Sequence, residues 1–362
     1  MKAAVISGSS EPNKLATIKD ITLPPIKPHQ LLIKAKAFAI NPTDWKHILY
    51  GIGQVDNIIG TDVSGIVEEV GSDVNGFAVG DCVSSFIHGN TSHTEGAFGE
   101  YAIVNPLATI KYPKGLHSAE GQAKPAETIT SFEGAASVTL GLVTVAISFS
   151  YYLNIDYNQD NNKDDFILIW GGSGASGVLA IQVAKVIYGL NVIATASSKN
   201  FKYLKSLGAD YVIDYKDPGI VEKIKQIGNG RIKYALDTIA EKETFQQVYD
   251  ATEGTPEVYL DNLLGLDGNS IETRPERNVH YGCTLAYNSL EKEVQIGPVK
   301  YIQTPELLNK YTEFWQGVLP LYIDQIYHSN LLILPRGLES VNRGLELSRQ
   351  GKVSAEKVVF GI

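Results

Sequence analysis

The chain has 362 residues, of which 44% are hydrophobic and 20% are charged, and its formal net charge is −9. This length exceeds the roughly 250–300 residues at which a single hydrophobic core stops growing, so we expect a globular protein with two domains. The negative charge argues against a nucleic-acid partner, which needs a basic face, and two cysteines are too few for a disulfide framework.

The N-terminal sequence MKAAVISG predicts a short strand and lacks the long apolar core of a secretory signal peptide. We also expect no apolar run of the about 18 residues that a membrane-spanning helix needs. A low cysteine content is typical of a reducing compartment. The sequence therefore predicts a cytoplasmic protein without a membrane partner.

Short apolar runs broken by Pro, Gly, Asn and Asp predict mostly β-structure over the first 135 residues. Examples of these runs are Gln30–Ala39, Gly65–Val70 and Gly99–Val104. The polar run Asn158–Asp165 predicts a surface loop.

From residue 166 onward, strand patterns alternate with helical patterns in units of about 30 residues, which predicts a doubly wound parallel sheet of the α/β class. The expected strands are 166–170, 191–196, 211–215 and 234–239, and the expected helices are 178–190, 200–207 and 219–227. Two more apolar runs follow near 258–264 and 279–285. After residue 305 the order changes to helix, strand, helix and strand. We therefore assign residues 140–305 to an α/β domain, and residues 1–139, with 306–362 returning to them, to a mostly β domain.

A glycine-rich turn follows the first of these strands and spells G-x-G-x-x-G at Gly172, Gly174 and Gly177. In a dinucleotide-binding domain the first glycine allows the tight turn, the second lets the backbone approach a pyrophosphate, and the third lets the helix pack on the strand. Amide groups at the start of the helix then face the phosphates. A purely structural turn is the alternative.

The end of the second strand, TASSKN at 195–200, indicates which dinucleotide binds. An NAD site has an acid about 20 residues after the glycines, whereas the next acid here is Asp210. Hydroxyl, amide and ammonium groups favour the additional phosphate of NADPH. Alternatively, a serine caps the next helix and the lysine is solvated. The residues predicted to face this phosphate are Ser197, Ser198, Lys199 and Asn200.

Further motifs occur in a fixed order: NPTDWK at 41–46, GTDVSG at 60–65, FAVGDCV at 77–83, GAFGEY at 96–101 and LGAD at 207–210. With the glycine turn, they resemble the medium-chain dehydrogenases/reductases, and within them the zinc-free quinone oxidoreductase and fungal enoyl reductase-like branch. The resemblance implies a GroES-like catalytic domain and a Rossmann domain with a cleft between them. It also implies that the pyrophosphate is contacted by Ser173, Gly174, Ala175 and Ser176. It further implies that Tyr215 lies near the 2′-phosphate, unless it is a surface tyrosine, and that Leu285 and Tyr287 lie near the nicotinamide.

Zinc-dependent relatives carry Cys and His ligands in two stretches that here read Asn41–Asp44 and Gly60–Asp62, with neither residue type. Tetrahedral zinc sites require such nitrogen and sulfur ligands. His88 and His93 are interpreted as loop residues. We therefore expect no metal.

Without zinc, catalysis requires donors aimed at the oxygen that gains charge. Lys46 is a candidate donor or a surface lysine, and Tyr50 is a candidate that resembles a catalytic tyrosine or a packed aromatic residue. Thr144 matches a family threonine near the nicotinamide, or bonds to its own helical turn. Asn41 and Asp44 shape the cleft, or simply form a turn.

These features predict an NADPH-dependent enzyme that transfers hydride to small α,β-unsaturated carbonyls or quinones. A zinc-free aldehyde reductase or alcohol dehydrogenase is the alternative, and a non-catalytic NADPH-binding sensor or scaffold is a third hypothesis. The expected partner is a small-molecule carbonyl substrate, and the expected assembly is a monomer or a homodimer.

Overall fold

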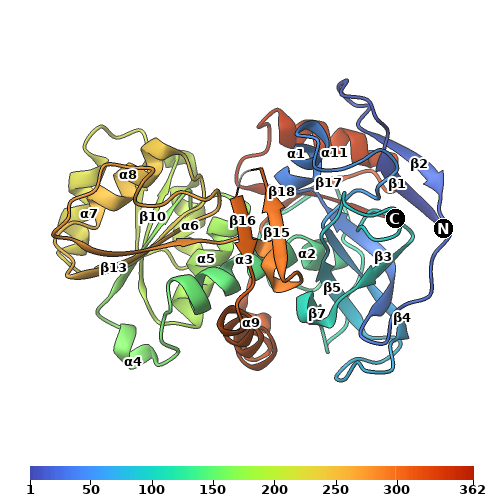
Figure 1. Cartoon of the computed structure of the whole chain (residues 1–362), viewed down its shortest axis with the longest axis horizontal. Coiled ribbons are helices and arrows are strands. Elements are labelled where there is room, and N and C mark those ends of the chain that lie inside the picture. Colours follow the sequence, from blue (N-terminus) through green and yellow to red (C-terminus); the bar gives the residue numbers. More distant parts are fainter. Residues whose placement is uncertain (298) are drawn as a thin grey trace. The chain divides into compact units, whose positions relative to one another are not determined.

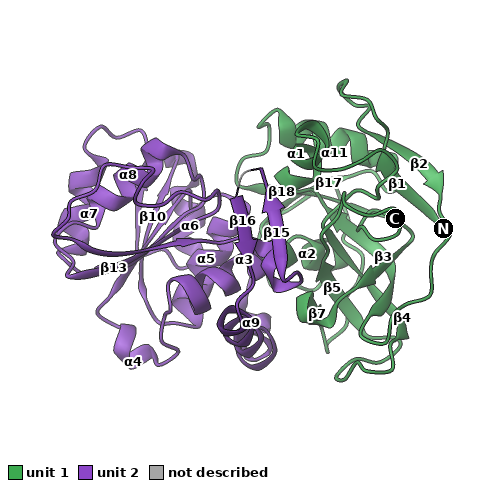
Figure 2. Cartoon of the chain, viewed as in Figure 1, with its two compact units in different colours: residues 1–140, 328–362 green, residues 141–327 purple. Residues whose placement is uncertain are grey.

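The computed structural model describes residues 1–297 and 299–362, which divide into two compact units (Figure 1 and Figure 2). Unit 1 comprises Met1–Leu140 and His328–Ile362, and unit 2 comprises Gly141–Tyr327. Residues 306–327, which we expected to return to the first domain, are part of unit 2. The reason is that helix α9 (Pro305–Thr312) packs against the π-helix η2 (Ser148–Tyr152) and the short helix η4 (Ala286–Ser289).

Unit 1 is built on a sheet with the strand order β7-β5-β4-β3-β18-β17-β8, in which β6 also pairs with β3. Its pairs are antiparallel except β17–β18. Phe38, Phe98 and Phe360 pack ring against ring in its core, with centroids 5.1–5.6 Å apart. The strands of the unit, with the separate pair β1–β2, are β1 (Lys2–Ile6), β2 (Ala16–Asp20), β3 (Leu31–Ala39), β4 (Asp62–Val70), β5 (Cys82–Phe86), β6 (Tyr101–Val104), β7 (Thr109–Lys111), β8 (Ala123–Lys124), β17 (Asn330–Leu334) and β18 (Glu356–Gly361).

The NPTD motif starts the first helix of unit 1, α1 (Pro42–Leu49). Pro42 occupies the first helical position, where a missing N–H is harmless. The Asp44 carboxylate accepts a hydrogen bond from the Asn41 N–H at 2.7 Å, which satisfies a backbone donor at the helix start. The motif is therefore a helix start, and α1 packs against α11 (Ser340–Arg349).

Unit 2 contains a six-stranded parallel sheet in the order β11-β10-β9-β12-β13-β14, which is the 3-2-1-4-5-6 order of dinucleotide-binding domains. Apolar side chains of α7 and α8 pack on one face, where Ile224 and Phe245 join the cluster of Leu168 and Ile193. The strands are β9 (Phe166–Trp170), β10 (Asn191–Ala196), β11 (Tyr211–Asp214), β12 (Ile232–Asp237), β13 (Glu257–Asn262) and β14 (Asn278–Cys283). The helices are α5 (Ala175–Val186), α6 (Phe201–Ser206), α7 (Ile220–Gly228) and α8 (Lys242–Ala251).

The remaining elements of unit 2 include the hairpin β15 (Glu293–Ile296) and β16 (Val299–Ile302), and the helices η5 (Glu313–Val318) and α10 (Leu319–Tyr322). The run Asn158–Asp165, which we expected to be a loop, contains a short helix, α4 (Gln159–Asn162). Its Asn158 side chain accepts a hydrogen bond from the Asp160 N–H and so supports the turn.

One apolar segment is longer than we expected. The helical segment Phe132–Tyr152, which comprises α2 (Phe132–Ala136), α3 (Thr139–Ile147) and η2, is long and apolar enough to span a membrane. However, 94% of its most apolar window is buried inside the protein. The expectation of no such run was therefore wrong, because small Gly, Ala, Ser and Thr residues interrupt the larger apolar side chains and hide its continuity.

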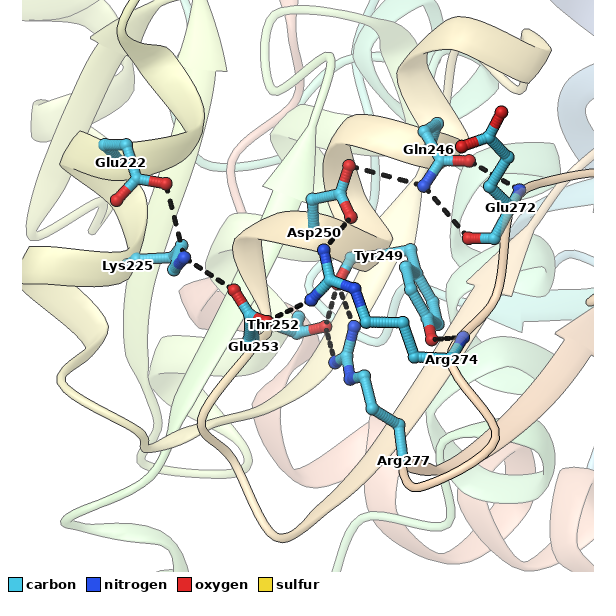
Figure 3. Close-up of polar contacts among 10 residues, drawn as sticks. All are labelled: Glu222, Lys225, Gln246, Tyr249, Asp250, Thr252, Glu253, Glu272, Arg274 and Arg277. Carbon is cyan, nitrogen blue, oxygen red and sulfur yellow. Dashed lines mark hydrogen bonds and ion pairs between the residues drawn. The ribbon is translucent and has the colours of Figure 1, made fainter.

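A polar network anchors the long connection between β13 and β14 to helix α8 (Figure 3). The Arg277 guanidinium lies 4.1 Å from the Tyr249 ring centroid and donates to the Tyr249 carbonyl at 2.6 Å and to Thr252 Oγ1 at 2.9 Å. Arg274 pairs with Glu253 and lies 3.3 Å from the Asp250 carboxylate. These contacts hold the connection in place without a crossover helix.

Candidate cofactor and catalytic sites

The glycine turn of unit 2 is held by hydrogen bonds from two neighbouring strands. Gly171 donates to Thr195 Oγ1 at 3.0 Å, and Gly172 donates to the Thr195 carbonyl at 2.8 Å. Thr238 Oγ1 donates to the Gly171 carbonyl at 3.1 Å. The turn then enters α5 at Gly174, and the first N–H groups of the helix are left without intrahelical partners. Amides in this arrangement, at the carboxyl end of the sheet, could hold an anion.

The roles of the individual glycines differ in part from the prediction. The left-handed residue that makes the tight turn is Gly171, with φ +81°, and not Gly172. A Cβ on Gly172 would meet only side chains, at 3.0–3.3 Å, so this glycine serves packing. A Cβ on Gly177 would lie 2.5 Å from the Gly171 carbonyl oxygen, which fits the predicted close approach of helix and strand. The sequence analysis missed Gly171 because it lies outside the G-x-G-x-x-G spelling.

The end of β10 presents polar side chains next to the end of β11. Ser197 Oγ lies 3.5 Å from the Tyr215 hydroxyl, and Tyr215 is 46% exposed. Lys216, which the sequence analysis did not single out, places its ammonium 5.8 Å from the Tyr215 ring centroid. The structure therefore brings Ser197 and Tyr215 together and adds a second lysine to this rim. Ser198 and Lys199 are exposed beside them, and Asn200 is buried.

The alternative role of these serines as helix caps lacks support in the structure. Ser197 precedes the short helix η3 (Ser198–Asn200) without a capping hydrogen bond from its side chain, and Asn200 precedes α6 in the same way. The nearest acid in sequence, Asp210, is engaged elsewhere: it pairs with Lys185 at 2.9 Å and accepts from the Val192 N–H. A carboxylate is thus held near the amino end of β10, away from this rim.

The predicted nicotinamide segment follows β14. Asp261 is buried and accepts a hydrogen bond from Thr284 Oγ1 at 2.6 Å, which ties the segment to the end of β13. Burial raises the pKa of Asp261 to about 6. Leu285 is half-buried and precedes η4, whereas Tyr287 lies inside that helix and is buried.

The predicted catalytic side chains of unit 1 lie on α1. Lys46 is half-buried, and its ammonium lies 5.7 Å from the Trp45 ring centroid. Tyr50 caps the carboxyl end of the helix and is 69% exposed, and its ring lies edge-on to the Trp45 ring, with centroids 6.4 Å apart. Thr144 belongs to unit 2 and is buried in α3.

Asn41 and Asp44 belong to a buried polar network that the sequence analysis did not foresee in full. Asn41 Nδ2 donates to Thr61 Oγ1 at 2.9 Å and to Asp62 Oδ2 at 2.8 Å, and Thr61 Oγ1 donates to Asp44 Oδ1 at 2.9 Å. Lys357, on β18, donates to Asn41 Oδ1 and lies 3.8 Å from Asp62 Oδ2. Burial raises the pKa of Asp44 to about 7 and that of Asp62 to about 6.

This network does not suit a zinc ion. The groups that could serve as metal ligands are an amide, a hydroxyl and two carboxylates, which are already hydrogen-bonded to one another. The ammonium of Lys357 lies next to them. Tetrahedral zinc sites use thiolate and imidazole ligands, often with a carboxylate, and a neighbouring ammonium would repel the ion. Among the described residues, no group of three or more His, Cys, Asp or Glu side chains is arranged to hold a metal ion.

Comparisons with known proteins agree with this architecture. The sequence matches the alcohol dehydrogenase GroES-like domain family over residues 27–114 and the zinc-binding dehydrogenase family over residues 175–255. It is 34% identical to an uncharacterized protein of Saccharomyces cerevisiae over 99% of each chain. It is also 32% identical to the trans-enoyl reductase ACTTS2 of Alternaria alternata, over 100% of this chain and 98% of that one. The chain belongs to the medium-chain dehydrogenase/reductase superfamily.

Within this superfamily it lies in the enoyl reductase and quinone oxidoreductase-like branch, as the motifs predicted. Its fold matches the quinone oxidoreductase from Coxiella burnetii with a TM-score of 0.67 and 23% identity, over 100% and 99% of the two chains. The predicted combination of a GroES-like domain and a Rossmann domain is thereby confirmed. As a medium-chain dehydrogenase/reductase, the protein is an oxidoreductase of a superfamily whose members bind nicotinamide cofactors.

Proposed function

We propose that the protein is a zinc-independent, NADPH-dependent reductase of small α,β-unsaturated carbonyls or quinones. The observation that carries the proposal is the composition of the NPTD region, where Lys46 lies on the helix that starts at a network of polar groups hydrogen-bonded to one another and to Lys357. Relatives named trans-enoyl reductases, 30–34% identical to this chain, support reduction of a conjugated double bond. A conjugated system spreads charge onto its oxygen and needs no strong Lewis acid.

The residues of unit 2 fit a phosphorylated dinucleotide. The amides of Ala175, Ser176 and Gly177 would hold the pyrophosphate, because they form the first turn of α5 and have no intrahelical partner, whereas the Gly174 N–H donates to the Gly171 carbonyl. Ser197, Lys199 and Tyr215 would hold the 2′-phosphate by hydrogen bonds and charge. NADPH, when bound, would supply the hydride.

The residues of unit 1 would handle the substrate oxygen. Lys46 would donate a hydrogen bond to the oxygen as negative charge develops there. The rigid start of α1, fixed by Pro42 and Asp44, would hold this lysine in one place. Tyr50 remains a second candidate donor, since its hydroxyl is exposed.

The decisive experiment mixes the purified protein with NADPH or NADH and with a matched substrate pair, an enal and its saturated aldehyde, plus a benzoquinone. We expect NADPH oxidation with the enal or the quinone, little oxidation with the saturated aldehyde, and a product in which the C=O bond survives. Equal turnover of the saturated aldehyde would favour the aldehyde reductase alternative. Tight NADPH binding without turnover would favour a sensor or scaffold.

Zinc independence is tested on the same preparation by elemental analysis and by dialysis against a strong chelator. We expect substoichiometric zinc and unchanged activity, and loss of activity that zinc restores would refute the proposal. We further propose a cytoplasmic monomer or homodimer acting on a small molecule. Light scattering after size-exclusion chromatography would distinguish the two assemblies.

A further inference from the structure

Lys357 is the most unusual charged residue of unit 1, because its side chain is buried, at 4% exposure, in the interior of the sheet. Lysines are almost never fully buried unless they are paired, since removing an ammonium from water is costly. Lys357 is paired: its Nζ donates to Asn41 Oδ1 and lies 3.8 Å from Asp62 Oδ2. The network therefore contains a cation whose position is dictated by two partners.

An ammonium group can only donate hydrogen bonds and a carboxylate can only accept them, so Lys357 and Asp62 together decide how the Asn41 amide is oriented. The amide oxygen must face Lys357, and the amide nitrogen must face Thr61 and Asp62, to which it donates at 2.9 and 2.8 Å. Thr61 Oγ1 accepts that bond, so its own proton is directed to Asp44 Oδ1, 2.9 Å away. The donor and acceptor roles of every hydrogen bond from Lys357 through Asn41 and Thr61 to Asp44 are therefore fixed in one direction.

The network ends at the first turn of α1. Asp44 uses its second oxygen, Oδ2, to accept the Asn41 N–H at 2.7 Å, the bond that fixes the start of the helix. This arrangement uses both oxygens of Asp44 as acceptors, and protonation of the carboxyl would turn one acceptor into a donor. The helix that starts here carries Lys46.

The charges of the network are unbalanced. One ammonium faces two carboxylates, Asp44 on α1 and Asp62 on β4, which oppose the lowering of the Lys357 pKa by burial. The Tyr112 hydroxyl, bonded to Ser84, is a further titratable group near Asp62. Burial raises the pKa of both carboxyls, and Lys357 opposes this effect. Loss of the ammonium would therefore favour the protonated carboxyls.

We propose that Lys357 is a positioning residue of the reductase site, which orients the Asn41 amide and keeps Asp44 an acceptor, so that α1 presents Lys46 in one place. This inference rests on the proposed role of Lys46 in reduction. It assigns a function to a lysine of the last strand, more than 300 residues from the helix it controls.

The test compares Lys357→Met with the wild type and with Lys352→Met, a control that removes an exposed lysine just before the same strand. We expect Lys357→Met to lower kcat for the enal at least tenfold while the KM for NADPH changes less than twofold. Because the carboxyls lose their cation, the acidic limb of the pH–rate profile should move to higher pH by about one unit. A kcat and a pH profile equal to those of Lys352→Met would overturn the inference.

A second variant and a second readout keep the inference testable if Lys357→Met does not fold or if the wild type proves inactive. Thr61→Val leaves all charges in place but removes the hydrogen bond to Asp44. The acidic limb of the pH–rate profile should therefore again move to higher pH, and an unchanged limb would contradict the proposed role of the network. Carboxyl carbon chemical shifts report Asp44 directly by NMR. A pKa of Asp44 that does not rise in the folded variants would overturn the inference without any reference to turnover.

Discussion

The closest approach in the glycine turn makes Gly177→Ala a sharp test of the cofactor site. The added Cβ would lie 2.5 Å from the Gly171 carbonyl oxygen and 2.8 Å from Gly172 Cα, whereas ordinary contacts begin at 3.4 Å. All the nearest atoms are backbone, so α5 must move by about 1 Å, and overpacking of this kind costs about 1–3 kcal/mol of stability. If one charge-assisted hydrogen bond of about 1.5–3 kcal/mol is lost with it, NADPH binds roughly 10- to 100-fold more weakly.

Gly174→Ala is the matched control, because it lies in the same turn but its added Cβ would be much less crowded. Its φ is −73°, and its Cβ would meet the Gly171 carbonyl oxygen only at 3.3 Å. We expect its free energy of unfolding to stay within about 1 kcal/mol of the wild type, while the methyl group obstructs the pyrophosphate and weakens NADPH binding. Denaturant unfolding and titration calorimetry measure the two effects. If Gly177→Ala keeps wild-type stability and affinity, the proposed helix–strand contact does not position the phosphate amides.

Three further perturbations address the rim, the anchored connection and the buried acids. Lys199→Ala should raise the Kd for NADPH about tenfold and leave that for NADH unchanged in a fluorescence titration; equal losses for both would remove the lysine from the 2′-phosphate site. Arg277→Ala should lower the free energy of unfolding by about 1–2 kcal/mol through loss of its contacts with Tyr249, whereas exposed Glu276→Gln should not; equal melting curves would refute this. Because burial raises the pKa of Asp44 to about 7, the folded protein retains a proton that the unfolded chain releases, so stability declines as pH rises from about 4 to 7. Asp44→Asn should remove this part of the pH dependence. If the free energy of unfolding, measured by urea titration, changes equally with pH in Asp44→Asn and in the wild type, the explanation is contradicted.

Most of the Rossmann-like unit could be predicted because its information is local. The strands β9 and β10 begin and end at the predicted residues, since each is a short apolar run closed by glycine or polar residues. The glycine turn was found in the same way, from a strand, a spacing and a helix. Only the residue with positive φ was misassigned, because neighbouring glycines leave open which of them takes that conformation.

The catalytic region of unit 1 was harder to predict because its partners are distant in sequence. Asn41 and Asp44 could be read as turn residues, but their contacts with Thr61 and Asp62 depend on strand pairing in the sheet. Lys357 was missed altogether, because nothing near it in the sequence marks it as buried. The return of the chain at His328 was also misjudged, since the packing of α9 on η2 depends on contacts that local patterns do not encode.

The match to a zinc-binding dehydrogenase family raises the question of what that name implies for this chain. The match covers residues 175–255, which lie within the Rossmann-like unit, so it concerns the fold of the cofactor domain and not the side chains of the NPTD region. There, the physical requirement of zinc is a set of deprotonated nitrogen and sulfur donors with free lone pairs. Here the polar groups of Asn41, Thr61 and Asp62 instead form hydrogen bonds with one another, and Asn41 also accepts one from the Lys357 ammonium. The fold of the cofactor domain therefore does not determine whether the other unit holds a metal ion, because that depends on a few side chains.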